Sequence, residues 1–213
     1  MQIIPTILEK NFVSAQNKIL AVKDYTKWIQ IDVIDGYFSF GKTFELELVN
    51  KINLVENILW DVHLMVKEPK NWIKKCDYIS TSRIVGQTEM MADADYFIKT
   101  VKDMGLDTGL AYDVETEIGK IPQDTDVVLL LGRKSGFNPL PFDRITFEKI
   151  KKLKQIKQEK RLDFKIGVDG GVNQGNIGHL KNEGAEIAYC GGAIFNGIVE
   201  DNIKKLEYAS KNY

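Results

Sequence analysis

The sequence predicts one α/β domain, a single (β/α)8 TIM barrel, and three observations support this fold class. Apolar strand-like runs alternate with amphipathic helical stretches along the whole chain, as in repeated βα units, and there are eight such runs. The chain has 213 residues and 44% hydrophobic content, which is enough for a substantial core. Neither a low-complexity linker nor a composition break divides it. We therefore expect one barrel domain over residues 1–213.

The elements follow in order from the N-terminus. Short apolar runs bounded by turn residues predict strands at residues 2–8, 28–33, 58–65, 78–84, 107–112, 127–131, 164–169 and 187–190. Apolar residues at helical spacing predict helices at residues 11–22, 70–75, 90–104, 147–158, 173–182 and 199–210. A doubly wound open sheet is the main alternative fold. It is disfavoured because no glycine-rich dinucleotide fingerprint follows the first strand.

The second predicted strand contains the most informative polar residues. Its apolar positions leave little room for a solvated face, which is typical of a parallel strand covered on both sides. Gln30 and Asp32 are two positions apart and therefore point to the same side. That side carries either chemistry or an internal hydrogen-bond network. For Asp32 the structural alternative is capping of a helix or binding of loop amides.

Composition narrows the partners and the compartment. The chain has 29 Lys and Arg against 30 Asp and Glu, so its net charge indicates neither nucleic acid nor a membrane surface as partner. Its two cysteines, Cys76 and Cys190, are far apart and fit a reducing compartment. The first residues enter a strand directly, and no apolar run reaches membrane-spanning length. We expect a cytoplasmic protein that acts on a small molecule.

Three ionisable residues stand at or near predicted strand ends. Asp32, His63 and Asp169 belong to the second, third and seventh strands, whose C-terminal ends meet on one face of a barrel. Two aspartates across a pocket suit a two-base epimerisation, in which one removes a proton beside a carbonyl and the other returns it on the opposite face. The three side chains are also candidate ligands for a divalent metal such as zinc, iron, manganese or cobalt. A core histidine and a turn-forming aspartate are the structural alternatives.

Two glycine pairs predict where a phosphate group binds. Gly170 and Gly171 follow the seventh strand, and Gly191 and Gly192 follow the eighth. Barrels commonly hold phosphate on backbone amides of these two loops. The alternative is that the glycines only permit tight βα turns.

These residues and their neighbours resemble the ribulose-phosphate 3-epimerase family. The similarity runs over essentially the whole chain and is carried by residues 4–8, 32–36, 61–65, 168–172 and 191–195. The resemblance implies a (β/α)8 barrel that interconverts ribulose 5-phosphate and xylulose 5-phosphate with a bound divalent metal.

The resemblance also assigns roles to single residues. Asp32 resembles the metal-bound base of the family and Asp169 its metal-bound partner acid. His63 resembles a metal ligand at the substrate site, and Met65 a residue that packs on the reacting centre. Thr6 occupies the place of a substrate-contacting serine.

The chain departs from the family at several positions. Gln30 stands where the family has a histidine as fourth metal ligand, and an amide oxygen is a weaker ligand than imidazole. The family loop after the sixth strand closes over the phosphate; here Gly136 is kept, two glycines are lost, and Pro139 has no amide to donate. Arg133 and Lys134 either donate charge there or face solvent.

Two further departures concern other strand ends. Residues 39–42 differ from the family pattern after the second strand, and residues 82–84 stand where the family has a histidine-containing end of the fourth strand.

The leading hypothesis is a metal-dependent epimerase acting at C3 of a ketose phosphate, ribulose 5-phosphate/xylulose 5-phosphate or a related phosphosugar. A diverged barrel that binds a phosphosugar without converting it is the first alternative, motivated by Gln30. Another phosphosugar lyase or isomerase is the second; such reactions usually need a lysine beside the strand-end carboxylates, and residues 30–36 and 61–66 contain none. Relatives are commonly oligomers, so a homo-oligomer is compatible with the sequence.

Overall fold

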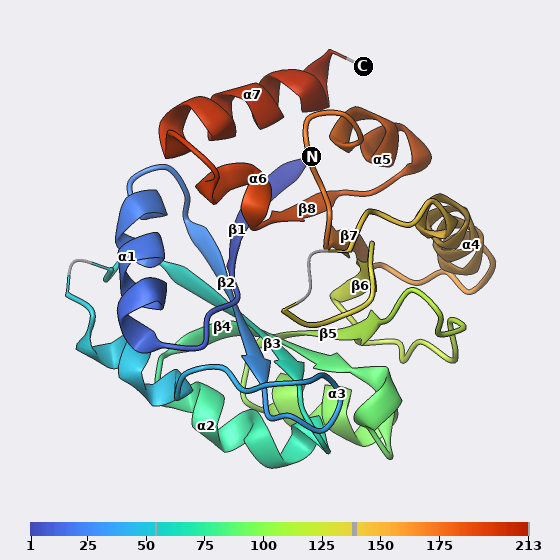
Figure 1. Ribbon diagram of the computed structural model, residues 1–213. Helices are drawn as coiled ribbons and strands as arrows, with labels where there is room; N and C mark the ends of the chain where they lie inside the picture. Colours follow the sequence, from blue (N-terminus) through green and yellow to red (C-terminus); the bar gives the residue numbers. More distant parts are fainter. Residues whose placement is uncertain (54, 138–139, 213) are drawn as a thin grey trace.

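Eight parallel strands close into a barrel in the order of the chain, which confirms the predicted fold class (Figure 1). The computed structural model describes residues 1–53, 55–137 and 140–212. The strands are β1 Gln2–Ile7, β2 Trp28–Ile34, β3 Leu59–Met65, β4 Thr81–Gln87, β5 Asp107–Tyr112, β6 Val127–Leu131, β7 Lys165–Asp169 and β8 Ile187–Cys190.

The helices surround the barrel on its outside (Figure 1). They are α1 Phe12–Val22, α2 Ile73–Asp77, α3 Ala94–Asp103, α4 Ile145–Glu159, α5 Ile177–Glu183, α6 Gly192–Phe195 and α7 Val199–Lys211. The short 3-10 helices are η1 Leu46–Lys51, η2 Pro69–Trp72 and η3 Thr88–Met90. Among the described residues, no helix is both long enough and apolar enough to cross a membrane.

Local capping explains where several helices begin. Asn11 precedes α1 and accepts a hydrogen bond from the Ser14 amide, and Asp93 precedes α3 and accepts one from the Tyr96 amide. The predicted helix over residues 90–104 was therefore too long at its N-terminal end. The predicted helix over residues 173–182 also begins later, at Ile177, because the Asn173 amide donates to the side chain of Asn176 in a turn.

The fourth strand was predicted three residues too early, whereas the other seven agree with the structure to within one residue. Residues 78–80, which were expected to open this strand, instead form the turn after α2, in which Ser80 has a φ of 50°. Thr81 then begins β4, and its hydroxyl donates to the Cys76 carbonyl at 2.7 Å. The strand therefore ends at Gln87, and Arg83 lies inside the barrel wall.

The core has two parts. The larger part lies between the strands and the surrounding helices, where fully buried side chains such as Ile19, Phe97 and Leu206 pack against the outer faces of the strands. A smaller apolar cluster includes Ile4, Val85 and Leu129. Burial of these apolar surfaces stabilises the barrel wall that holds the polar residues described next.

Candidate functional site

Three buried ionisable side chains meet where the barrel opens at the C-terminal ends of its strands. Asp32 of β2 is in register with His63 of β3, and Asp169 is the last residue of β7. Ligand atoms of the three residues all lie within 4.8 Å of one another. The structure thus brings together the three residues that the sequence placed on one face.

The two carboxyl groups and the imidazole affect one another strongly. Burial and the charge of Asp32 raise the pKa of Asp169 to about 7, although His63 and the Gly170 amide partly oppose this. Burial lowers the pKa of His63, but the hydrogen bond and charge of Asp32 outweigh it, so the pKa is raised. When both carboxyl groups are ionised, the cluster of Asp32, His63 and Asp169 therefore carries more negative than positive charge.

Two further side chains orient the cluster. The Nδ1 atom of His63 lies 3.1 Å from Asp32 Oδ1, and its Nε2 atom lies 2.9 Å from Gln87 Oε1. The Thr6 hydroxyl lies 2.9 Å from Asp32 Oδ2. Gln87 was missed in the sequence because the end of strand four was placed at Ile84. Placing the end of this strand correctly would have identified Gln87 as a site residue.

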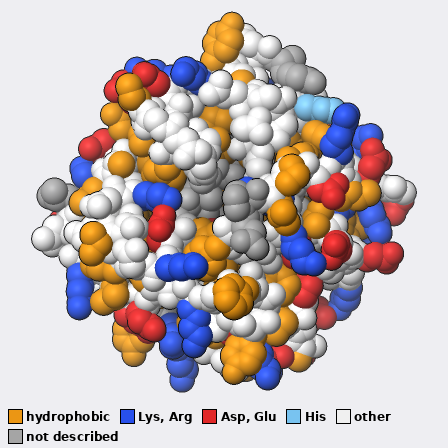
Figure 2. Space-filling model, in the orientation of Figure 1, with side chains coloured by type: hydrophobic (Ala, Val, Ile, Leu, Met, Phe, Trp, Pro, Cys, Tyr) orange, Lys and Arg blue, Asp and Glu red, His pale blue; other side chains and the backbone are white. Residues whose placement is uncertain are grey.

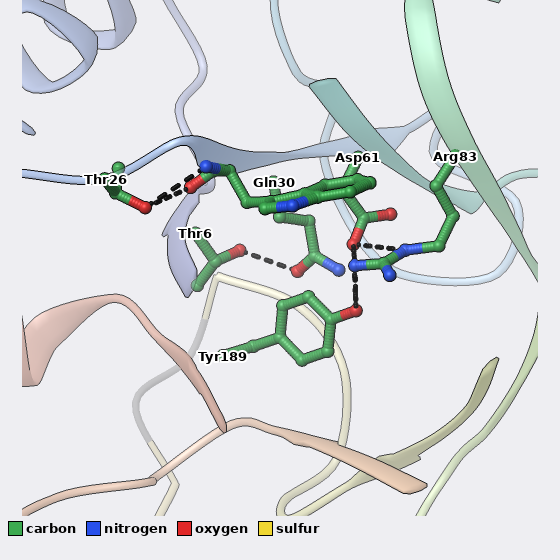
Figure 3. Close-up of polar contacts among 7 residues, drawn as sticks. Thr6, Thr26, Gln30, Asp61, Arg83 and Tyr189 are labelled. Carbon is green, nitrogen blue, oxygen red and sulfur yellow. Dashed lines mark hydrogen bonds and ion pairs between the residues drawn. The ribbon is translucent and has the colours of Figure 1, made fainter. Parts of the chain in front are cut away.

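Gln30 lies beneath this cluster, inside the barrel. Its side chain is fully buried, and its Oε1 atom accepts a hydrogen bond of 2.9 Å from the Thr6 hydroxyl (Figure 3). Its Nε2 atom has no hydrogen-bond partner within the described part of the chain. The Thr6 hydroxyl is 2.9 Å from both Gln30 Oε1 and Asp32 Oδ2, so the two residues share its single proton.

A second polar cluster fills the barrel next to Gln30. Arg83 donates to Asp61 Oδ2 from Nε at 3.0 Å and from Nη2 at 2.5 Å, and the Tyr189 hydroxyl donates to the same oxygen at 2.8 Å (Figure 3). Burial lowers the pKa of Arg83, but Asp61 and Tyr189 outweigh it and the pKa is raised. This cluster is neutral as a unit and does not line the cleft described next.

A cleft of about 720 Å³ opens above the cluster of Asp32, His63 and Asp169, the upper of the two polar clusters. Asp32 and Asp169 line it, whereas His63 and Gln30 do not reach it. The other predicted substrate-binding residues all line it: Thr6, Met65, Gly136, Gly170, Gly171, Gly191 and Gly192. Backbone and side chains that are neither hydrophobic nor charged dominate the molecular surface over β8 and α6 on this face (Figure 2).

The loop after β7 requires its glycines. Gly170 and Gly171 have φ angles of 89° and 74°, a region that residues with side chains rarely adopt. The Gly170 amide is directed at the Asp169 carboxyl group. In the loop after β8, Gly191 packs against the Thr6 side chain and Gly192 begins α6.

The loop after β6 lies across the middle of the barrel (Figure 1). A side chain at Gly136 would overlap the Ser39 hydroxyl, which itself donates to the Ser135 carbonyl at 3.3 Å. Lys134 lines the rim of the cleft with an exposed side chain that pairs with Glu115 at 3.3 Å. Pro139, which was expected to remove an amide from this loop, lies outside the described residues.

The donor set fits a divalent metal. Asp32, His63 and Asp169 offer two carboxylates and one imidazole, which suit borderline and hard first-row cations. The Nε2 atom of His63 bonds Gln87, so its Nδ1 atom remains on the side of the two carboxylates. Such an outer hydrogen bond is the usual partner of a metal-binding histidine.

Comparisons with known proteins identify a family. The profile described as ribulose-phosphate 3 epimerase family matches residues 2–195. A ribulose-phosphate 3-epimerase of Bacillus subtilis (strain 168) is 30% identical over 200 residues, covering 92% of this chain and 92% of the relative. That of Buchnera aphidicola subsp. Acyrthosiphon pisum (strain APS) is 29% identical over 218 residues, covering 96% and 94%.

Solved structures share the fold at lower identity. Phosphoribosyl anthranilate isomerase from Thermococcus kodakaraensis is similar with a TM-score of 0.66 and 14% identity, covering 100% of this chain and 99% of that protein. At this identity the likeness shows the barrel fold alone. The family profile and the curated relatives go further: the chain belongs to the ribulose-phosphate 3 epimerase family and is an isomerase, a carbohydrate epimerase.

Proposed function

We propose that this protein is a metal-dependent epimerase that inverts C3 of a ketose phosphate, with ribulose 5-phosphate and xylulose 5-phosphate as the first candidates. The observation that carries the proposal is the placement of two carboxyl groups, Asp32 and Asp169, at the floor of one cleft. They come from β2 and β7, which are not neighbours in the barrel. They can therefore approach a bound carbon from different sides.

The reaction needs one proton acceptor and one proton donor. The ionised Asp32 carboxylate takes the C3 proton, and the electron pair of the C–H bond moves toward the C2 carbonyl to give an enediolate. The Asp169 carboxyl group then returns a proton to the opposite face of C3, and the C2 carbonyl reforms. The roles exchange in the reverse direction.

The surrounding residues orient these groups. The Thr6 hydroxyl fixes one oxygen of Asp32, and His63 fixes the other. Met65 provides an apolar wall of the cleft. A divalent cation held by Asp32, His63 and Asp169 supplies positive charge beside the enediolate when bound. The glycine loops after β7 and β8 offer backbone amides for the phosphate.

Proton exchange with solvent tests the proposal. Purified protein supplied with Zn, Fe, Mn or Co should incorporate deuterium at C3 of ribulose 5-phosphate in deuterated buffer, as followed by NMR. Other ketose phosphates run in parallel identify the preferred sugar. Absence of exchange across these sugars and metals would reject the proposal.

A second candidate function is phosphosugar binding without turnover. The position of Gln30 favours it, because this residue is fully buried beneath the cluster, does not line the cleft, and replaces the stronger imidazole ligand expected there. Metal analysis of protein purified without chelators separates the two functions. A stoichiometric transition metal supports the epimerase, whereas metal-free protein that still binds ribulose 5-phosphate supports the binding protein.

A further inference from the structure

The cations that line the cleft differ in their partners. Lys18 pairs with Glu9 at 2.5 Å, and Lys134 pairs with Glu115 at 3.3 Å. Arg133 also lines the cleft, yet no carboxylate oxygen of the described residues lies within 4.0 Å of its guanidinium nitrogens, the limit for an ion pair. Its one hydrogen bond in this part of the chain runs from Nη1 to the Leu140 carbonyl at 3.3 Å. A guanidinium group has five N–H donors, so most of those of Arg133 have no partner among the residues that the structure describes.

Arg133 lies against the loop in which a phosphate is expected. It comes two residues after the end of β6, and a Cβ atom added to Gly170 would lie only 2.9 Å from Arg133 Cγ. Its charge also lowers the pKa of Asp169, against the larger effects of burial and Asp32. Arg133 thus lies beside Gly170 and lines the same cleft as Asp169.

Arg133 is a chemically suitable partner for an anion bound at the Gly170–Gly171 loop. The planar guanidinium group matches phosphate geometry and forms two parallel hydrogen bonds. Lys134, the next residue, is exposed and paired with Glu115. It therefore serves as a control cation that has no recorded contact with Gly170. Comparing substitutions at these two adjacent positions therefore distinguishes a specific phosphate contact from the effect of general positive charge.

We propose that Arg133 binds the phosphate group of the substrate and makes the cleft selective for phosphorylated ketoses over neutral ones. The identity of the ligand rests on the proposed function, but phosphate binding itself does not. The phosphate lies against Gly170 and Gly171, with Arg133 as its charged partner.

Calorimetric titration with inorganic phosphate tests the contact without any turnover. Arg133→Gln should weaken phosphate binding roughly ten- to a hundredfold, the usual effect of losing a charge-assisted hydrogen bond. Lys134→Gln should bind within about twofold of the original protein, because its charge is screened and paired. Arg133→Lys should fall between them. Unchanged phosphate affinity in Arg133→Gln, or no phosphate binding by the original protein, would overturn the proposal.

Turnover provides the second arm. Arg133→Gln should lower kcat/KM for ribulose 5-phosphate by a much larger factor than kcat/KM for unphosphorylated ribulose, with an unaltered urea midpoint. Equal losses for both sugars would mean that Arg133 acts on Asp169 or on the fold, and would overturn the proposal. If the original protein epimerises neither sugar, the proposed function fails, and the phosphate titration still decides the role of Arg133.

Discussion

Two buried polar clusters share the interior of this barrel, and they differ in charge and in access. In the lower cluster, Asp61 is matched by Arg83, and Tyr189 donates to the same carboxylate oxygen. In the upper cluster, two carboxyl groups accompany one imidazole. Asp61 and His63 are both fully buried, so burial does not distinguish the two clusters.

The difference teaches that unmatched charge beside a cleft marks the functional cluster. In the lower cluster the charge of Asp61 is balanced by Arg83, and the contacts among Asp61, Arg83 and Tyr189 join β3, β4 and β8 without a ligand. Two carboxyl groups within 4.8 Å of each other repel when both are ionised, and only a proton, a cation or a substrate relieves this. Four predictions test this division, from the largest expected effect to the smallest.

Asp32→Asn should lower deuterium incorporation at C3 roughly a hundred- to ten-thousandfold, because it removes a proton-transferring group. Stability to urea should stay the same or rise, because one of two repelling carboxylates is removed. Asp61→Asn is the matched control in the lower cluster and should instead lower stability while exchange per folded molecule is kept. Retained exchange in Asp32→Asn would contradict the assigned base.

Arg83→Met should lower the free energy of unfolding by about 3–5 kcal/mol, because it leaves Asp61 buried without its counter-charge. Urea denaturation measures this effect. The double change Asp61→Asn with Arg83→Met should recover part of the loss, since no uncompensated charge remains. A stable Arg83→Met protein that has lost exchange would show that the lower cluster serves catalysis.

Gln87→Leu should weaken metal binding roughly ten- to a hundredfold, the usual cost of losing a hydrogen bond behind a metal-binding histidine. Competition with a chromophoric chelator measures the affinity. Gln87→Glu keeps an acceptor for His63 Nε2 and should retain the affinity. Equal affinity in the leucine and glutamate variants would mean that Gln87 does not hold His63 for a metal.

Gln30→His should strengthen metal binding by roughly tenfold, because imidazole is a better ligand than an amide oxygen for these cations. The same chelator competition, run with Zn, Mn and Co, also reports any change in preference. Unchanged affinity would assign position 30 to the lower cluster and leave the site with three protein ligands.

Much of the fold and site was predictable from local pattern. The apolar runs of β6 and β8 are continuous because both faces of these strands are covered, so their predicted bounds match the structure. Asp32, His63 and Asp169 were expected together because strand ends converge in a barrel. Gln87 was not found, because Ser80 takes a left-handed turn that delays β4 and no local pattern reports such a turn.

The sequence by itself determined the closed barrel, the family and the three residues that meet at its open end. These follow from periodicity and from the order of the strands, which fix which faces are apolar and which ends converge. Only the tertiary structure decided that Thr6 lies beside Gln30, that Asp61 is neutralised by Arg83, and that Arg133 lies against Gly170. Such contacts join side chains from separate strands and loops, and their partners depend on register and rotamer, which local sequence does not encode.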